Sequence, residues 1–171
     1  MLNYQTDWEI LALRKQYRQY RQYSQDYDLS KPVWIGDTCY QFQLLSLFDD
    51  RLKVYLPAQF EELPEPIARV KYPSGNRPPI IKTNGALNVD FTFSLLSKAA
   101  APLTVQSVWQ EIDRHFPRNV LYETGAFKSE KIETIWLEYK NFSLETEVYN
   151  ILFIVQCADG AVMLGRALFN I

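Results

Sequence analysis

The segment Glu147–Cys157 constrains the fold more than any other part of this sequence. Every residue from Ile151 to Val155 is apolar, so a strand here carries apolar side chains on both of its faces. Strands of this kind usually lie in the middle of a sheet that is covered on both sides. The sequence therefore predicts a layered protein with this strand near the centre of its sheet.

The flanking segments supply antiparallel neighbours for that strand. Glu130–Phe142 precedes it and Ala161–Phe169 follows it, and the dipeptide Asp159-Gly160 is typical of a tight hairpin turn. An earlier hairpin is predicted from the alternating strand Tyr40–Leu44 and its partner Leu52–Leu56. Local hairpins of this kind indicate an antiparallel sheet.

One further strand and one helix complete the expected core. The strand Asn88–Leu96 alternates apolar residues with Asp90, Thr92 and Ser94, which predicts one face toward the core and one toward water. The helix Leu103–Phe116 has apolar residues at helical spacing and ends before a proline. We expect a single core that joins Phe91, Phe93, Val108, Trp109, Ile112, Phe153 and Val155.

The fold class that follows is α+β. We expect residues 33–171 to form one domain, an antiparallel sheet with the Leu103–Phe116 helix packed on one face and further cover on the other. The chain has 171 residues, 47% of them apolar and 22% charged, which excludes wholesale disorder. A net charge of −2 gives no general attraction to nucleic acid or to anionic membranes.

Residues 1–30 are expected to form a separate amphipathic helix rich in Tyr, Arg and Gln, opened by a capping box at Thr6 and Glu9. Aromatic stripes at helical spacing usually pack on the rest of the protein. Tyr and Arg are also favoured in protein interfaces, and they can stack on single-stranded nucleic acid. The candidate interaction surface comprises Tyr17, Tyr20, Tyr23, Tyr27, Arg14, Arg18 and Arg21.

The segment Pro57–Pro79 contains six prolines, which predicts irregular chain with a short helical turn around Pro66–Val70. Within it, the sequence Ser74-Gly75-Asn76-Arg77 is typical of a turn with an exposed arginine. Turn amides together with a guanidinium could also bind an anion, so Arg77 is the candidate anion contact.

A family resemblance rests on this layout. The proline-rich crossing holds Lys71-Tyr72-Pro73 and Arg77-Pro78, and Pro102-Leu103 opens the helix that precedes the three closing strands. Residues 33–171 thereby resemble the Mog1/PsbP-like α/β/α sandwich group, particularly its small bacterial members. The resemblance implies a sandwich fold and a binding or assembly role, and it brings no common active site.

Residues with reactive side chains are few. Cys39 and Cys157 lie far apart in strand-like segments, so we expect buried free thiols, with a disulfide between them as the alternative. One histidine and two separated cysteines do not make a standard zinc site, and we expect no metal or cofactor. His115 follows Glu111 by one helical turn, which predicts a surface pair, with an acid/base pair as the alternative.

The sequence favours a soluble, non-enzymatic domain that binds a protein partner or a second copy of itself. Met1–Glu9 is too polar for a secretory signal and no apolar run is long enough to span a membrane, so we expect a cytoplasmic protein. The first alternative is a small-molecule-binding or hydrolytic domain with a site in the proline-rich crossing near His115. The second is an RNA-binding accessory that uses the N-terminal helix.

Overall fold

The computed structural model of this chain describes residues 9, 11–14, 27–35, 37–96, 103–115, 118–130, 132–142 and 147–170. The chain divides into two compact units, one of residues 1–45 with 55–58 and one of residues 46–54 with 59–171. Each unit is described by itself.

The smaller unit contains short antiparallel pairs. Strand β1 (Val33–Ile35) pairs with β2 (Thr38–Tyr40). Strand β3 (Phe42–Leu47) pairs with β4 (Leu52–Pro57), and the tip of this hairpin, residues 46–54, belongs to the larger unit. Phe48, Asp49 and Asp50 at the tip have positive φ angles of 56°, 56° and 64°. The hairpin predicted around Asp49-Asp50 is confirmed.

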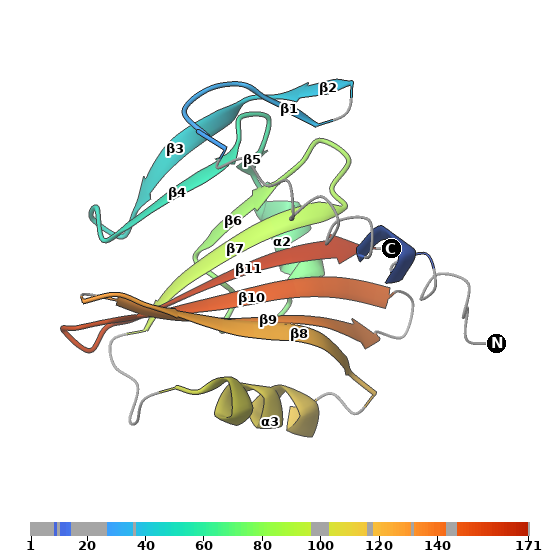
Figure 1. Ribbon diagram of the computed structural model, residues 1–171. Coiled ribbons are helices and arrows are strands. Elements are labelled where there is room, and N and C mark those ends of the chain that lie inside the picture. Colours follow the sequence, from blue (N-terminus) through green and yellow to red (C-terminus); the bar gives the residue numbers. More distant parts are fainter. Residues whose placement is uncertain are drawn as a thin grey trace. The chain divides into compact units, whose positions relative to one another are not determined.

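The larger unit is built on a seven-stranded antiparallel sheet in the order β5-β6-β7-β11-β10-β9-β8 (Figure 1). Strand β10 pairs with β9 along one edge and with β11 along the other, which confirms its predicted place inside the sheet. The strands of this sheet are β5 (Glu61–Glu62), β6 (Ile80–Thr83), β7 (Val89–Leu96), β8 (Val120–Lys128), β9 (Ile132–Phe142), β10 (Glu147–Cys157) and β11 (Val162–Asn170).

Two helices, α2 (Glu65–Lys71) and α3 (Val105–His115), pack on this sheet. Val108 of α3 lies against a buried cluster that includes Ile135 and Ile154, and Trp109 meets the Tyr139 ring edge to face at 6.0 Å. Ala68 of α2 packs in a second cluster with Leu63 and Ile81. Strand register places both clusters on the same face of the sheet.

The expected single core is wrong, because the sheet divides its residues between two faces. Phe93 and Phe153 lie on the face opposite to the helices, where their rings are 6.2 Å apart and the Phe153 ring covers Gly165. Val108 and Trp109 lie on the helix face, and each is half-buried. Sequence periodicity showed which residues were apolar but did not show which face of each strand met the helix.

The expectation that the polar face of β7 meets water is also wrong. Asp90 is 1% exposed and Thr92 is buried. This face lies toward the helices, and Lys71 and Tyr72 at the end of α2 provide polar partners for Asp90. A buried carboxylate is tolerated because its charge is paired and hydrogen-bonded.

Other differences concern single elements. Strands β5, β6 and β8 were not predicted, and β8 lacks a regular alternation because its pairing with β9 shifts register between Leu121 and Glu123. Cys39 is exposed and Cys157 half-buried, so the prediction of two buried thiols is wrong, although both are free. Among the described residues, no helix has the length and apolar character needed to cross a membrane.

Candidate functional site: a pocket in the proline-rich crossing

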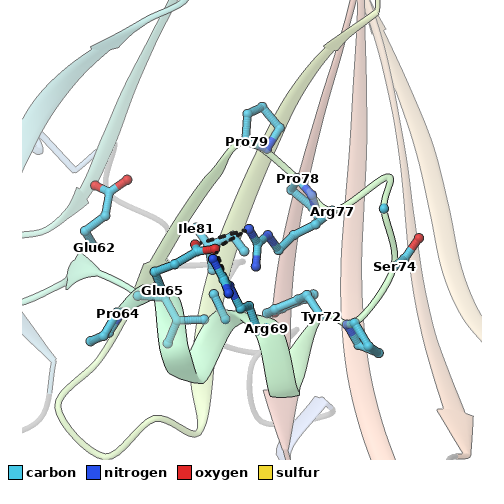
Figure 2. A pocket seen from close by; sticks show the side chains of 14 residues that line it. Glu62, Pro64, Glu65, Arg69, Tyr72, Ser74, Arg77, Pro78, Pro79 and Ile81 are labelled. Carbon is cyan, nitrogen blue, oxygen red and sulfur yellow. Dashed lines mark hydrogen bonds and ion pairs between the residues drawn. The ribbon is translucent and has the colours of Figure 1, made fainter.

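A pocket of about 810 Å³ lies in the proline-rich crossing, around helix α2 (Figure 2). Its walls come from the chain that enters α2, from α2 itself, from the loop that follows it and from β6. Cavities of roughly 300–1,000 Å³ are typical of small-ligand sites. The lining residues are Glu62, Leu63, Pro64, Glu65, Ala68, Arg69, Tyr72, Pro73, Ser74, Gly75, Arg77, Pro78, Pro79 and Ile81.

Prolines shape this pocket because they fix the backbone at both ends of α2. Pro64 is the N-cap of α2 and Pro66 lies in its first turn, where a missing amide hydrogen costs nothing. The helix ends where the Tyr72 amide donates to the Ala68 carbonyl at 2.8 Å. The Leu63 amide donates to the Ile81 carbonyl at 2.9 Å, which fixes the start of the crossing to β6.

Two arginines converge on one carboxylate at this pocket. Arg77 Nη2 donates to both oxygens of Glu65 at 2.9 and 3.1 Å, and Arg69 Nε donates to Glu65 Oε1 at 3.0 Å. Figure 2 shows both guanidinium groups pointing to that side chain. The hydrogen bond from Arg69, followed by that from Arg77, lowers the pKa of Glu65 below its usual 4.5. The group therefore carries one more positive than negative charge.

A buried hydrogen-bonded cluster fixes the inner end of the pocket wall. Asp90 accepts from Tyr72 Oη at 2.6 Å and from Thr83 Oγ1 at 2.7 Å, and Lys71 Nζ lies 2.7 Å from the same carboxylate. Lys71 also donates to the Leu87 carbonyl at 2.7 Å. Burial, and then the bond to Asp90, raises the pKa of Tyr72 well above its ordinary value. Tyr72 is therefore a fixed donor that positions the wall.

The predicted anion contact, Arg77, lies in this pocket. The turn predicted before it is present, since the Arg77 amide donates to the Ser74 carbonyl at 3.1 Å and the Asn76 amide to Ser74 Oγ at 3.1 Å. The structure adds a partner that the sequence analysis did not name, because Glu65 already occupies the Arg77 guanidinium.

The predicted N-terminal surface is largely outside the described residues. Tyr17, Tyr20, Tyr23, Arg18 and Arg21 fall there. Residues 9 and 11–14 are helical, Arg14 is half-buried, and Tyr27 is exposed. The role of this surface stays a prediction.

His115 is a surface residue of α3. Its Nδ1 lies 2.9 Å from the Glu111 carbonyl and 3.4 Å from the Glu111 carboxylate, and both side chains are more than half exposed. It is not among the residues that line the pocket, so the alternative that placed it near a site in the proline-rich crossing gains no support from the lining. Within the described part of the chain, no three His, Cys, Asp or Glu side chains come together as a metal-binding group.

Sequence analysis missed Glu65, Arg69, Tyr72 and Asp90 as parts of this site. Glu65 and Arg69 are four residues apart, a spacing that favours an ion pair on a helix, and this signal was available in the sequence. Asp90 gave no such signal because Tyr72, its hydrogen-bond partner, lies 18 residues earlier in the chain.

Comparisons with known proteins identify the fold. No protein-family model matches the chain, and no curated protein matches it. Among solved structures, the chain is similar to the Ran-binding protein Mog1p of Saccharomyces cerevisiae, with 9% identity, a TM-score of 0.53, and coverage of 77% of this chain and 78% of that one.

The chain is also similar to the cyanobacterial PsbP protein of a Synechocystis species, with 10% identity and a TM-score of 0.54. That match covers 80% of this chain and 85% of the other. The fold is Mog1/PsbP-like. The resemblance drawn from the strand order and the proline placement is confirmed at the level of the fold.

Proposed function

We propose that this chain is a non-enzymatic binding domain, and that its α2 pocket holds a short peptide segment of a protein partner. The segment carries an acidic residue next to an apolar one. The observation that carries the proposal is the convergence of Arg69 and Arg77 on the single carboxylate of Glu65, beside a proline-walled hollow.

Charge favours an acidic residue in the partner. Guanidinium groups bind carboxylates in planar, often bidentate arrangements, and each has more donors than Glu65 alone can satisfy. Arg69 is exposed and the side chain of Arg77 is 27% exposed, so both remain accessible to a second carboxylate. A peptide carboxylate that bridges the two arginines would balance the excess positive charge.

The walls favour an apolar neighbour of that acidic residue. Pro64, Pro73, Pro78 and Pro79 present apolar rings on a backbone that has little freedom to lose. A preformed site of this kind binds with a smaller ordering cost than a flexible one.

The shared fold supports a protein partner. Mog1p is described as a Ran-binding protein, and it has the same fold as this chain at 9% identity. We expect the chain to act in the cytoplasm, where Cys39 and Cys157 would stay reduced.

The test is selection of a random-peptide phage library on the whole chain. We expect enriched sequences that pair Asp or Glu with an apolar residue, and we expect the R69Q/R77Q variant to lose at least roughly ten-fold in affinity for them. The matched control is Arg114→Gln, which removes an exposed arginine paired with Glu111 on α3. No enrichment, or equal binding to the R69Q/R77Q variant, would contradict the proposal.

A small carboxylate ligand is the second candidate, and the volume of the pocket favours it. A series of thermal-shift measurements with acetate, succinate and citrate distinguishes a small carboxylate ligand from a peptide ligand. Stabilisation by a small acid that disappears in the R69Q/R77Q variant, without peptide enrichment, would assign the pocket to a metabolite.

A further inference from the structure

The two edges of the seven-stranded sheet differ in length and chemistry. One edge is β5, two residues long, and both residues are exposed glutamates. The other edge is β8, nine residues long and free of proline. Within the described residues, β8 pairs with β9 alone. Its charged residues are Glu123 and Lys128, and Lys128 pairs with Glu133 of β9. Long edge strands without proline can act as templates for pairing with another chain.

Strand β8 also carries apolar side chains on its surface. Val120 is 41% exposed, Leu121 37% and Phe127 62%. Gly125 is covered by the Trp136 ring of the neighbouring strand. Such a strand offers a sheet edge and exposed apolar side chains to a partner.

An irregularity in β8 places two of these side chains on one face. In a regular strand, residues seven apart lie on opposite faces. Here the register shift between Leu121 and Glu123 adds one residue, so Val120 pairs with Lys140 and Phe127 with Thr134 on the face opposite to α3. Leu121 and Ala126 pair with Tyr139 and Ile135 on the helix face.

We propose that two copies of this chain pair antiparallel through β8, about a two-fold axis at Thr124. In this register Glu123 faces Gly125 of the second copy. Beyond the irregularity, Leu121 faces Ala126 and Val120 faces Phe127. Each pair lies on a single face of the combined sheet, so the strand is complementary to itself, as an isologous interface requires.

Charges at the ends of β8 fit the same register. Arg118 precedes β8 and Glu130 follows it, and both are exposed. Antiparallel pairing brings Arg118 of one copy close to Glu130 of the other at both ends of the interface. Neither residue forms an ion pair with another residue of the described part of the chain. This charge complementarity favours a second copy over an unrelated strand.

The first test is sedimentation equilibrium of the whole chain over a roughly hundred-fold concentration range, because mass action makes association concentration-dependent. We expect a dimer that Phe127→Lys weakens by at least roughly ten-fold in dissociation constant. The control is Val70→Lys, which places the same charge at an exposed apolar position on α2. Circular dichroism confirms that each variant is folded.

Charge reversal then tests the register. Arg118→Glu and Glu130→Arg should each weaken the dimer, and R118E/E130R should restore it. A monomer at all concentrations overturns the proposal, as does an equal effect of Phe127→Lys and Val70→Lys. Failure of the double reversal to restore a dimer that both single reversals weaken overturns the register. None of these outcomes depends on peptide binding at the α2 pocket.

Discussion

The two edge strands of the seven-stranded sheet, β5 and β8, differ in length and in the side chains that they expose. At the β5 end, the edge strand is short and acidic, and the crossing with α2 lies over the neighbouring strands. At the β8 end, the strand is long and its apolar side chains are exposed. A short charged edge discourages strand pairing, whereas a long edge with exposed apolar side chains favours it.

The difference extends to the interactions that hold each helix to the sheet. The end of α2 is held by charge and hydrogen bonds at the buried Asp90 carboxylate. Helix α3 is held by half-buried apolar residues such as Val108 and by the ring contact of Trp109 with Tyr139. Polar clusters specify one arrangement and are costly to break in part, whereas apolar contacts are lost more gradually.

Asp90→Ala should have the largest effect on stability. It removes one partner of a buried ion pair and leaves Lys71, Tyr72 and Thr83 without their common acceptor. We expect a loss of about 3–5 kcal/mol in the free energy of unfolding, measured by urea denaturation. Asp159→Ala removes an exposed carboxylate that pairs with Arg51 and accepts from the Ala161 amide at 3.0 Å, and it should cost much less than Asp90→Ala. Equal effects would show that the α2 end does not depend on its polar cluster.

Trp109→Ala tests the α3 end of the same comparison. Full burial would predict a loss of roughly 3–5 kcal/mol. The Trp109 side chain is half-buried, so we expect about 2 kcal/mol, with Trp109→Phe retaining part of the ring contact. If Trp109→Ala lowers the free energy of unfolding more than Asp90→Ala does, the α3 contacts contribute more to stability than the polar cluster at α2, and the expected order is wrong.

Tyr72→Phe sharpens the role of the polar cluster through pH. At neutral pH it should cost about 1 kcal/mol, because one hydrogen bond to Asp90 is lost. The folded protein raises the pKa of Tyr72 above the ordinary 10.0, so the unfolded chain loses this proton first as pH rises. Its contribution is complete below that value and falls above it. Urea midpoints in alkaline buffer should therefore fall more steeply for the wild type than for the variant, and parallel curves would contradict this assignment.

Glu65→Gln should have the smallest effect, confined to acid pH. The arginines lower the pKa of Glu65 below 4.5, so its contribution is present above that value and is lost as pH falls through the lower folded value. The thermal midpoint of the wild type should thus depend slightly more on acid pH than that of the variant. If the thermal midpoints of the wild type and the variant fall equally at acid pH, the two arginines contribute to binding but not to folding.

Sequence patterns predicted the elements with regular periodicity. Strands β9, β10 and β11 and helix α3 have clear periods of two or of 3.6 residues, and each was predicted within a few positions of its observed bounds. Strand β8 was not predicted because its register shift and Gly125 interrupt the alternation of apolar and polar residues. An alternating pattern also does not show which face of β7 other elements cover. Asp90 was therefore predicted to be exposed to solvent.

The candidate site was predictable only in part. The proline-rich crossing and Arg77 were singled out, because prolines and turn residues leave a local signal. The pocket itself depends on contacts between distant residues, such as the Glu65–Arg77 ion pair and the Tyr72–Asp90 hydrogen bond. Pairings across such separations are set by the packed structure and leave no fixed spacing in the sequence.

The contrast between the two edges can be measured directly by amide hydrogen exchange of the whole chain at low and high concentration. We predict that residues 120–128 of β8 exchange more slowly in concentrated protein, while β5, β6 and α2 exchange at the same rate in both samples. Phe127→Lys should abolish the concentration dependence. Exchange of β8 that is independent of concentration, or equal slowing at both ends of the sheet, would contradict the account.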